Sequence, residues 1–106
     1  MENYSIKIKG GNTCDVKIKA NNVFTIYNIS LSKTKEKKNA IQLMYSTNKG
    51  TNGMIGYLSE KADICQMQMK LEILPNTVVC FEAIGEGEIY LNGVIYTFDN
   101  ETKSEN

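Results

Sequence analysis

The sequence predicts an all-β fold, a sandwich or jelly roll of eight or nine short strands, and two observations predict it. Apolar and polar residues alternate with a period of two along most of the 106-residue chain, as they do in strands with one buried face. Clusters of Gly, Asn and Pro interrupt this alternation about every 8–12 residues, which is typical of turns in an all-β domain. No segment shows a sustained helical period, and the length suits a single domain.

The first half of the chain contains four predicted strands. Three of them alternate apolar residues with Lys, Gln or Met, whereas residues 23–31 (VFTIYNISL) are apolar on both faces. The apolar positions of the alternating strands are Ile6 and Ile8, Val16 and Ile18, and Ile41, Leu43 and Tyr45. We expect these side chains to point into the core.

The clearest strand covers residues 65–73. Its odd-numbered residues are all apolar, and its even-numbered residues are Gln, Gln, Lys and Glu. Residues 78–84 (VVCFEAI) follow and, like residues 23–31, are apolar on both faces. Either both of these segments are central strands, or one face of a strand meets another subunit.

Turn-forming residues separate the predicted strands. The turns are Gly10-Gly11-Asn12, Asn21-Asn22, Asn48 through Gly53, Pro75-Asn76 and Gly85-Glu86-Gly87. We expect residues 33–39 (KTKEKKN) to form a solvated hairpin loop. Asn92-Gly93 has two interpretations: a type I′ hairpin turn, or a mid-strand Gly93 that a neighbouring backbone approaches closely.

The composition excludes several classes of function. There is no His and no Trp, and all twelve basic residues are Lys, so a Ser-His-Asp or Cys-His enzyme is excluded. No ligand spacing typical of zinc or calcium is present, and we expect no catalytic site, metal or cofactor. Because twelve acidic residues balance the twelve Lys, we also expect no direct binding to nucleic acid.

The three cysteines indicate a reducing compartment. Cys14, Cys65 and Cys80 have no CxxC spacing and are expected to be reduced structural thiols. The sequence shows neither a secretory signal nor an apolar run long enough to span a membrane. We therefore expect an intracellular protein with no membrane partner.

Charge is distributed unevenly between the two halves of the chain. Residues 1–49 hold nine Lys and three acidic residues, whereas residues 50–106 hold three Lys and nine acidic residues. This division predicts either one basic and one acidic surface or, because the halves of a sandwich interleave, ordinary solvated charge.

Three segments together resemble a known family. They are FTIYNISLSK (residues 24–33), AIQLMYSTNKGTNGMIGYLS (residues 40–59), and the run from Val78 through GEGEIYLNGV (residues 85–94). In this order and spacing the chain resembles the nucleoplasmin-like domain over about residues 1–98. It is most similar to the branch found in nuclear prolyl isomerases and plant histone-deacetylase-like nuclear proteins.

The resemblance implies a fold, an assembly and a function. The fold is an eight-stranded jelly roll, the assembly is a homopentameric ring, and the function is histone chaperoning and chromatin assembly in the nucleus. The partners implied are further copies of the chain and core histones. The family has one continuous strand through the last Gly of the motif, which favours the mid-strand interpretation of Gly93. The lysine-rich residues 33–38 stand where ring-stacking members carry acids, so we predict no stacking of rings.

One feature of the N-terminal region departs from the family. Asn3-Tyr4-Ser5 stands where members usually begin with Phe-Trp-Gly. We place the core domain at residues 1–98, and we interpret residues 99–106 (DNETKSEN) as a polar, disordered tail or the start of a linker.

Acidic residues are the candidate histone contacts. We place a histone-binding surface at Glu86 and Glu88 on the Gly-rich turn, extended by Asp99, Glu101 and Glu105 where the tail leaves the sandwich. A pentamer repeats each charge five times, so weak contacts gain from multivalency.

Two other functions compete with the histone chaperone. One is a structural pentamerisation domain for a C-terminally fused domain such as a prolyl isomerase. The other is a monomeric β-sandwich that binds a ligand such as a carbohydrate, which the absence of Trp and the 8% aromatic content disfavour.

Overall fold

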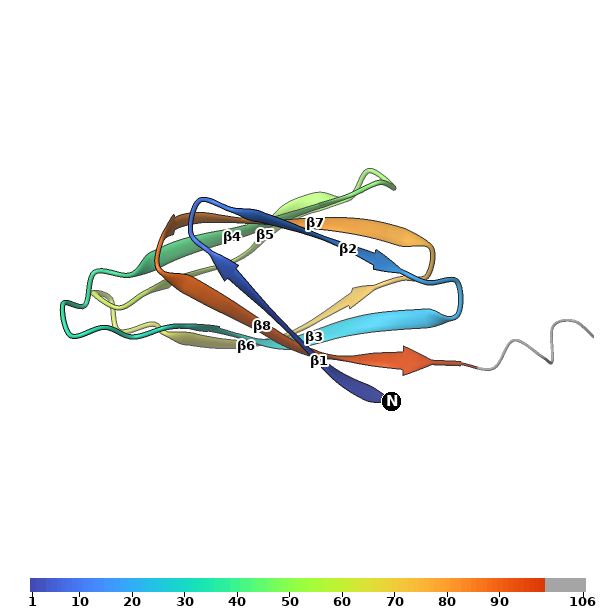
Figure 1. Ribbon diagram of the computed structural model, residues 1–106, viewed down its shortest axis with the longest axis horizontal. Helices are drawn as coiled ribbons and strands as arrows, with labels where there is room; N and C mark the ends of the chain where they lie inside the picture. The colour runs from blue at the N-terminus through green and yellow to red at the C-terminus, as the bar shows by residue number, and fades with distance from the viewer. Residues whose placement is uncertain (99–106) are drawn as a thin grey trace, which may run out of the picture.

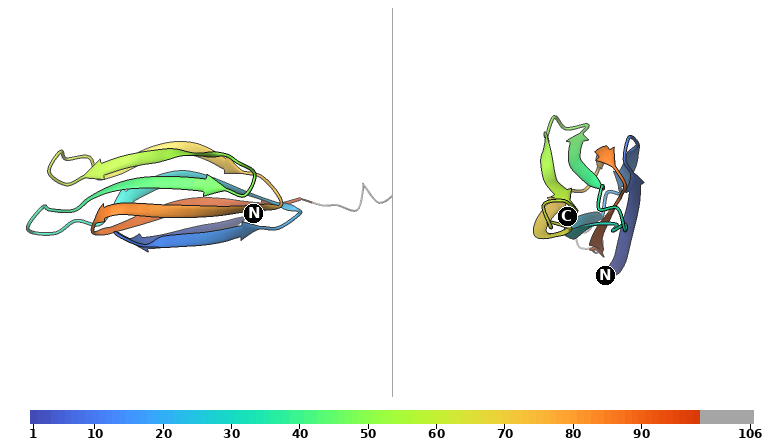
Figure 2. Two further views of the ribbon diagram at one scale, coloured as in Figure 1. Left: turned by 90° about the horizontal axis from the view of Figure 1, so that it is seen from above. Right: turned by 90° about the vertical axis from the view of Figure 1, so that its left-hand side faces the viewer.

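The computed structural model describes residues 1–98 as two four-stranded antiparallel sheets packed face to face (Figures 1 and 2). The strands are β1 (Glu2–Lys9), β2 (Thr13–Ile18), β3 (Asn22–Leu31), β4 (Ala40–Thr47), β5 (Asn52–Ser59), β6 (Gln66–Ile73), β7 (Thr77–Glu86) and β8 (Glu88–Thr97). The first sheet has the order β1-β8-β3-β6 and the second sheet the order β2-β7-β4-β5. Within the described residues there is no helix, and hence none that could cross a membrane.

This strand order is that of a jelly roll. Six of the seven connections between successive strands pass from one sheet to the other, and β4–β5 is the one hairpin in the described part of the chain. The prediction of an eight-stranded jelly-roll sandwich is therefore confirmed. Residues 33–39 do not form a hairpin loop as expected, because β3 and β4 lie in different sheets and do not pair.

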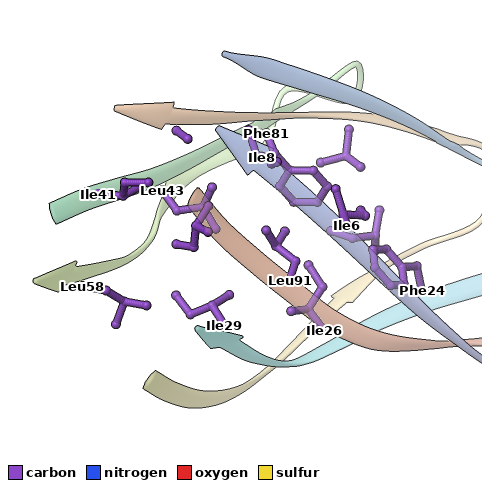
Figure 3. Packing of buried hydrophobic residues seen from close by; sticks show 14 of the residues in the cluster. Ile6, Ile8, Phe24, Ile26, Ile29, Ile41, Leu43, Leu58, Phe81 and Leu91 are labelled. Carbon is purple, nitrogen blue, oxygen red and sulfur yellow. The ribbon is translucent and has the colours of Figure 1, made fainter. Parts of the chain in front are cut away.

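The core lies between the two sheets and is built from the apolar positions of the alternating strands (Figure 3). Phe24 from β3 and Phe81 from β7 are its largest side chains, and both are completely buried. Burying one Leu, Ile or Phe side chain contributes roughly 1.5–3 kcal/mol. The buried aliphatic residues around the two rings are Ile6, Ile8, Ile26, Ile29, Ile41, Leu43, Leu58, Val79, Ile89 and Leu91.

The two segments that are apolar on both faces differ in the structure, although both are central strands. β3 lies between β8 and β6 and has a bulge between Ile26 and Asn28. β7 lies between β2 and β4, but it buries one face and leaves Val78 and Ile84 36% and 47% exposed on the other. The outer face of β7 is therefore uncovered in the monomer, with the exposed Glu82 between Val78 and Ile84.

Gly93 lies in the middle of β8, so the hairpin interpretation of Asn92-Gly93 is wrong and the close-approach interpretation is confirmed. Gly93 pairs with Tyr4 on one side and Ile26 on the other. A Cβ atom at this position would overlap the carbonyl oxygen of Thr25 and come within 2.8 Å of the Phe24 ring. Neither the backbone nor the buried ring can move aside cheaply, which restricts the position to Gly.

Tyr4 packs the first half of β1 against the core. Its ring meets the buried ring of Phe24 edge to face, with centroids 5.3 Å apart and an interplanar angle of 84°. This geometry is the favoured one for an aromatic pair. Tyr4 therefore adds to the buried Ile6 and Ile8 in packing β1 against the core.

Gly93→Ala should destabilise the fold by about 1–3 kcal/mol, because the added methyl group overpacks a strand crossing with no free space. Thermal unfolding followed by circular dichroism measures the change. Gly53→Ala is the matched control: it also lies in a strand, and its Cβ would make an ordinary 3.4 Å contact with the Tyr45 ring. Equal stability of the two variants would contradict the crowding argument.

Candidate functional site

One end of the sandwich collects four of the connections between strands, and the candidate acidic residues Glu86 and Glu88 lie there (Figure 1). The strand register places the β1–β2, β3–β4, β5–β6 and β7–β8 connections together at this end. β8 starts here at Glu88 and runs to Thr97 at the opposite end. The charged and polar neighbours at this end determine how strongly Glu86 and Glu88 can attract a cationic partner.

Residues 85–87, here named the glycine corner, carry the chain from β7 in the second sheet to β8 in the first. Gly85 and Gly87 have φ angles of 138° and 111°, which side chains other than Gly rarely adopt. A Cβ at Gly85 would overlap the Ala40 carbonyl, and one at Gly87 would come within 2.6 Å of the Asn39 side-chain nitrogen. The corner is thus pressed against the start of β4, and this fixes the backbone on both sides of Glu86.

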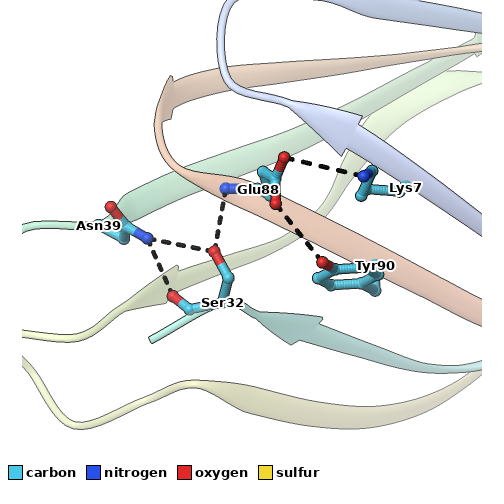
Figure 4. Close-up of polar contacts among 5 residues, drawn as sticks. All are labelled: Lys7, Ser32, Asn39, Glu88 and Tyr90. Carbon is cyan, nitrogen blue, oxygen red and sulfur yellow. Dashed lines mark hydrogen bonds and ion pairs between the residues drawn. The ribbon is translucent and has the colours of Figure 1, made fainter. Parts of the chain in front are cut away.

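Glu88 lies on the outer face of the first sheet in a set of polar contacts (Figure 4). Its carboxylate lies 4.0 Å from the Lys7 ammonium group and accepts a hydrogen bond from the Tyr90 hydroxyl at 3.5 Å. Its backbone N–H donates to the Ser32 hydroxyl at 3.3 Å, and Asn39 donates to the Ser32 carbonyl at 3.0 Å. The ion pair is long and exposed, so Lys7 compensates the charge of Glu88 only weakly.

Glu86 is exposed at the end of β7, but it has lysine neighbours. It lines an open hollow together with Lys37 and Lys38 of the β3–β4 connection and with Lys61 after β5. Glu36 lies in the same hollow and pairs with Lys38 at 3.4 Å. A cationic partner at Glu86 therefore has to compete with three neighbouring ammonium groups.

Glu60 fixes the lysine loop, which we define as residues 33–38. Its carboxylate accepts hydrogen bonds from the backbone N–H and hydroxyl of Thr34, at 2.6 and 3.0 Å, and from the backbone N–H of Asn39 at 2.9 Å. Loss of water around the carboxyl raises the pKa of Glu60, but these hydrogen bonds and the charge of Lys37 outweigh that effect. The pKa therefore lies below its ordinary value of 4.5. The sequence analysis did not identify this role, because Thr34 and Asn39 lie more than 20 residues from Glu60 along the chain.

A second pair of carboxylates lies on the outer face of the second sheet and was also missed. Asp15 faces Cys80 across the β2–β7 pairing, and Glu82 is the next outward residue on β7. A hydrogen bond to the Asp15 side chain, burial, and the charges of Asp15 and Glu82 raise the pKa of the Cys80 thiol. The alternation along β2 and β7 gave the only sequence signal for this pair.

The remaining predicted site residues, Asp99, Glu101 and Glu105, lie outside the described residues. Residues 1–98 carry eleven Lys and nine acidic residues, so the jelly roll by itself is slightly cationic. Lys103 and three acidic residues follow it in the sequence. Cys14, Cys65 and Cys80 are free and half-buried, and residues 1–98 contain no group of three or more His, Cys, Asp or Glu placed to hold a metal.

The sequence and the fold were compared with known proteins. The family model described as the nucleoplasmin-like domain matches residues 3–96. The Drosophila NLP core, described as giving insight into pentamer formation and histone binding, superposes with a TM-score of 0.76 at 15% identity, over 92% of this chain and 100% of that chain. The nucleoplasmin-like N-terminal domain of Drosophila FKBP39 superposes with a TM-score of 0.69 at 16% identity, over 92% and 91%. Comparison with curated protein sequences gave no significant match.

Glu60→Gln should lower the thermal unfolding midpoint at neutral pH, and the difference from the wild type should shrink in acid. Because the folded-state pKa of Glu60 is lowered, its ionised form stabilises the folded chain above pH 4.5, and this contribution is lost as the pH falls through the lowered pKa. Unfolding midpoints measured between about pH 7 and about pH 3 test the prediction.

Glu36→Gln is the matched control, since it removes an exposed carboxylate from the same loop and should leave the midpoint unchanged. A difference between Glu60→Gln and the wild type that is the same at every pH would show that the carboxylate charge has no part in holding the loop.

Proposed function

The chain belongs to the nucleoplasmin-like domain family, and on that premise we propose that it is the ring-forming core of a nuclear histone chaperone. It acts as a homopentamer that binds core histones during chromatin assembly, and it performs no catalysis. Both structural neighbours support the proposal by fold, and the NLP core is itself described in connection with pentamers and histones.

The observation that carries the proposal is a complete family jelly roll that leaves large apolar side chains in water. Met54, Tyr57 and Ile84 are 56%, 50% and 47% exposed. Soluble monomers rarely expose apolar side chains in contiguous patches unless the patch binds something. A ring of identical wedges covers such surface, because each copy contacts the next.

Histone binding in this proposal rests on repeated carboxylates. Glu86 and Glu88 at the glycine corner, together with Asp99, Glu101 and Glu105, supply the charge that attracts basic histone segments. The lysines beside Glu86 weaken each contact, and Lys7 does the same at Glu88. Fivefold repetition compensates, since several weak contacts made at once give useful avidity.

A second candidate is an assembly domain whose main role is to bring five copies of a larger protein together. The slightly cationic charge of residues 1–98 favours it, because a core with more lysines than acids attracts histones only locally. The FKBP39 neighbour is likewise described as an N-terminal domain. Histone binding by the pentamer separates the two candidates.

The chain should have a solution mass of about 60 kDa, five times its 11.9 kDa. Light scattering on a sizing column measures it directly. A mass near twice that value would indicate stacked rings and contradict our prediction from the lysine loop. A species of about 12 kDa would exclude the ring and return attention to a monomeric ligand-binding sandwich.

Replacing both Glu86 and Glu88 with Gln should weaken core-histone binding by about threefold to tenfold at low salt, and the effect should fade as salt is added. Fluorescence titration with labelled histones gives the affinities. The matched control is Glu2→Gln with Glu72→Gln, which removes the same charge near the other end of β1 and β6. Unchanged affinity in an intact pentamer would remove Glu86 and Glu88 from the binding surface.

A further inference from the structure

We propose that Tyr27 and Tyr96 form a site of oxidative modification, at which a one-electron oxidant joins the two rings by a carbon–carbon bond. The pair lies on the outer face of the first sheet, with Tyr27 on β3 and Tyr96 on β8. These strands are neighbours in that sheet (Figure 1). The two phenol oxygens are 3.2 Å apart and share a hydrogen bond. The product is a dityrosine link within one chain.

The bulge in β3 brings the two tyrosines together. In the register between β3 and β8, Tyr27 is the extra residue that has no partner on β8. A bulge commonly re-aims a side chain. Tyr96 lies opposite Val23, so the two tyrosines start on either side of Thr25 along the sheet. Their hydroxyls meet because the two side chains extend toward each other.

The burial of Thr25 shows that the pair is packed against the sheet. Phe24 and Ile26 are completely buried, so the alternation of β3 turns the Thr25 side chain outward. Thr25 is nevertheless only 1% exposed. We attribute this burial to the two tyrosine side chains that meet beside it. Tyr27 and Tyr96 themselves are 37% and 39% exposed, so a small oxidant in the solvent reaches them.

The surroundings of the pair keep Tyr96 protonated. The hydrogen bond to Tyr27 and the loss of water raise the pKa of Tyr96, while the charges of Lys70 and Glu72 act in opposite directions. Oxidation of a neutral phenol removes a proton together with an electron. An oxygen already in hydrogen-bond contact can accept that proton, so each hydroxyl assists oxidation of the other.

Two one-electron oxidations and one bond formation give the link. Each phenol loses an electron and its hydroxyl proton and becomes a phenoxyl radical. The radicals then form a carbon–carbon bond between ring carbons adjacent to those that carry oxygen. Each of these carbons releases its hydrogen as a proton, and each phenolic oxygen takes a proton back. The two electrons and two protons lost overall reduce hydrogen peroxide to two molecules of water, a reaction that haem peroxidases catalyse.

Proximity selects this pair from the six tyrosines of the chain. The Tyr90 hydroxyl donates to Glu88, and the Tyr4 ring packs against Phe24. Tyr57 is the most exposed tyrosine, at 50%. Within residues 1–98, no second pair of tyrosine hydroxyls shares a hydrogen bond. Reactants held side by side behave as if they were at very high concentration, so coupling within the pair outruns coupling between chains.

The rest of this outer face offers the oxidant little else. Ser5, Asn92 and Asn28 form a hydrogen-bonded row across β1, β8 and β3, with distances of 2.9 and 3.1 Å. Their amides and hydroxyl are not readily oxidised. Two of the three cysteines belong to the second sheet, and Cys65 packs against the core. The tyrosine pair is therefore the oxidisable group on this face.

The link should stabilise the fold. It joins residues 69 positions apart and fastens the last strand to the middle of the first sheet. A crosslink that closes so long a loop stabilises mainly by restricting the unfolded chain. We expect the thermal unfolding midpoint of the linked chain to exceed that of the untreated chain by at least about 5 °C.

Peroxidase with limiting hydrogen peroxide tests the proposal on the purified chain. We expect dityrosine fluorescence and, under denaturing conditions, a product with the mass of one chain less two hydrogen atoms. Tyr27→Phe and Tyr96→Phe should each lower the yield by about tenfold or more. Tyr57→Phe is the matched control: it removes a more exposed phenol and should leave the yield unchanged.

The position of the link is measured on the wild-type chain as well, so the test does not depend on the variants. Tandem mass spectrometry of a digest should find the peptides that contain Tyr27 and Tyr96 joined to each other. A link between other tyrosines, a product mainly at twice the chain mass, or an unchanged yield in Tyr27→Phe would overturn the proposal. None of these readouts depends on the ring, because the denatured mass is the same for a monomer and a pentamer.

Discussion

The crowded end of the sandwich is the constraint on which the rest of the structure depends. The chain passes between the sheets in six of its seven described connections, and four connections meet at this end. Each crossing removes backbone groups from the sheet ladder, and these groups need other partners. Gly85 and Gly87 allow the crossing from β7 to β8, and Asn39 packs against Gly87 while donating to Ser32. A larger residue at Gly85 would collide with the Ala40 carbonyl, and one at Gly87 would collide with the Asn39 side chain.

This constraint also determines the electrostatics of that end. Glu60 accepts three hydrogen bonds from the β3–β4 connection and so holds the lysine loop beside Glu86. The result is a mixed surface, in which acidic and basic groups lie together and no single sign dominates. Attraction of a basic partner by such a surface depends on repetition in an assembly rather than on the charge of one copy.

The two outer faces of the sandwich differ in their side-chain chemistry. The first sheet presents hydrogen-bonded amides and hydroxyls, and the second presents Met54 and Tyr57 on β5 together with Ile84 and Glu82 on β7. In an isolated monomer, Met54 and Tyr57 leave about half of their side-chain surface in water, which is unfavourable for apolar groups.

The sequence by itself determined the strands, because side-chain alternation with a period of two is a local property, readable at Ile6 and Ile8 as at residues 65–73. It also placed Glu86 and Glu88 at a turn between Gly residues. The sequence could not decide whether β7 was covered on both faces or whether Asn92-Gly93 formed a hairpin turn. It also could not show what Glu60 contacts. Those answers depend on partners far away in sequence: Gly93 meets Thr25, and Glu60 meets Thr34 from 26 residues away. Only the tertiary structure brings such pairs together, since nothing in the local pattern specifies which strand lies beside which.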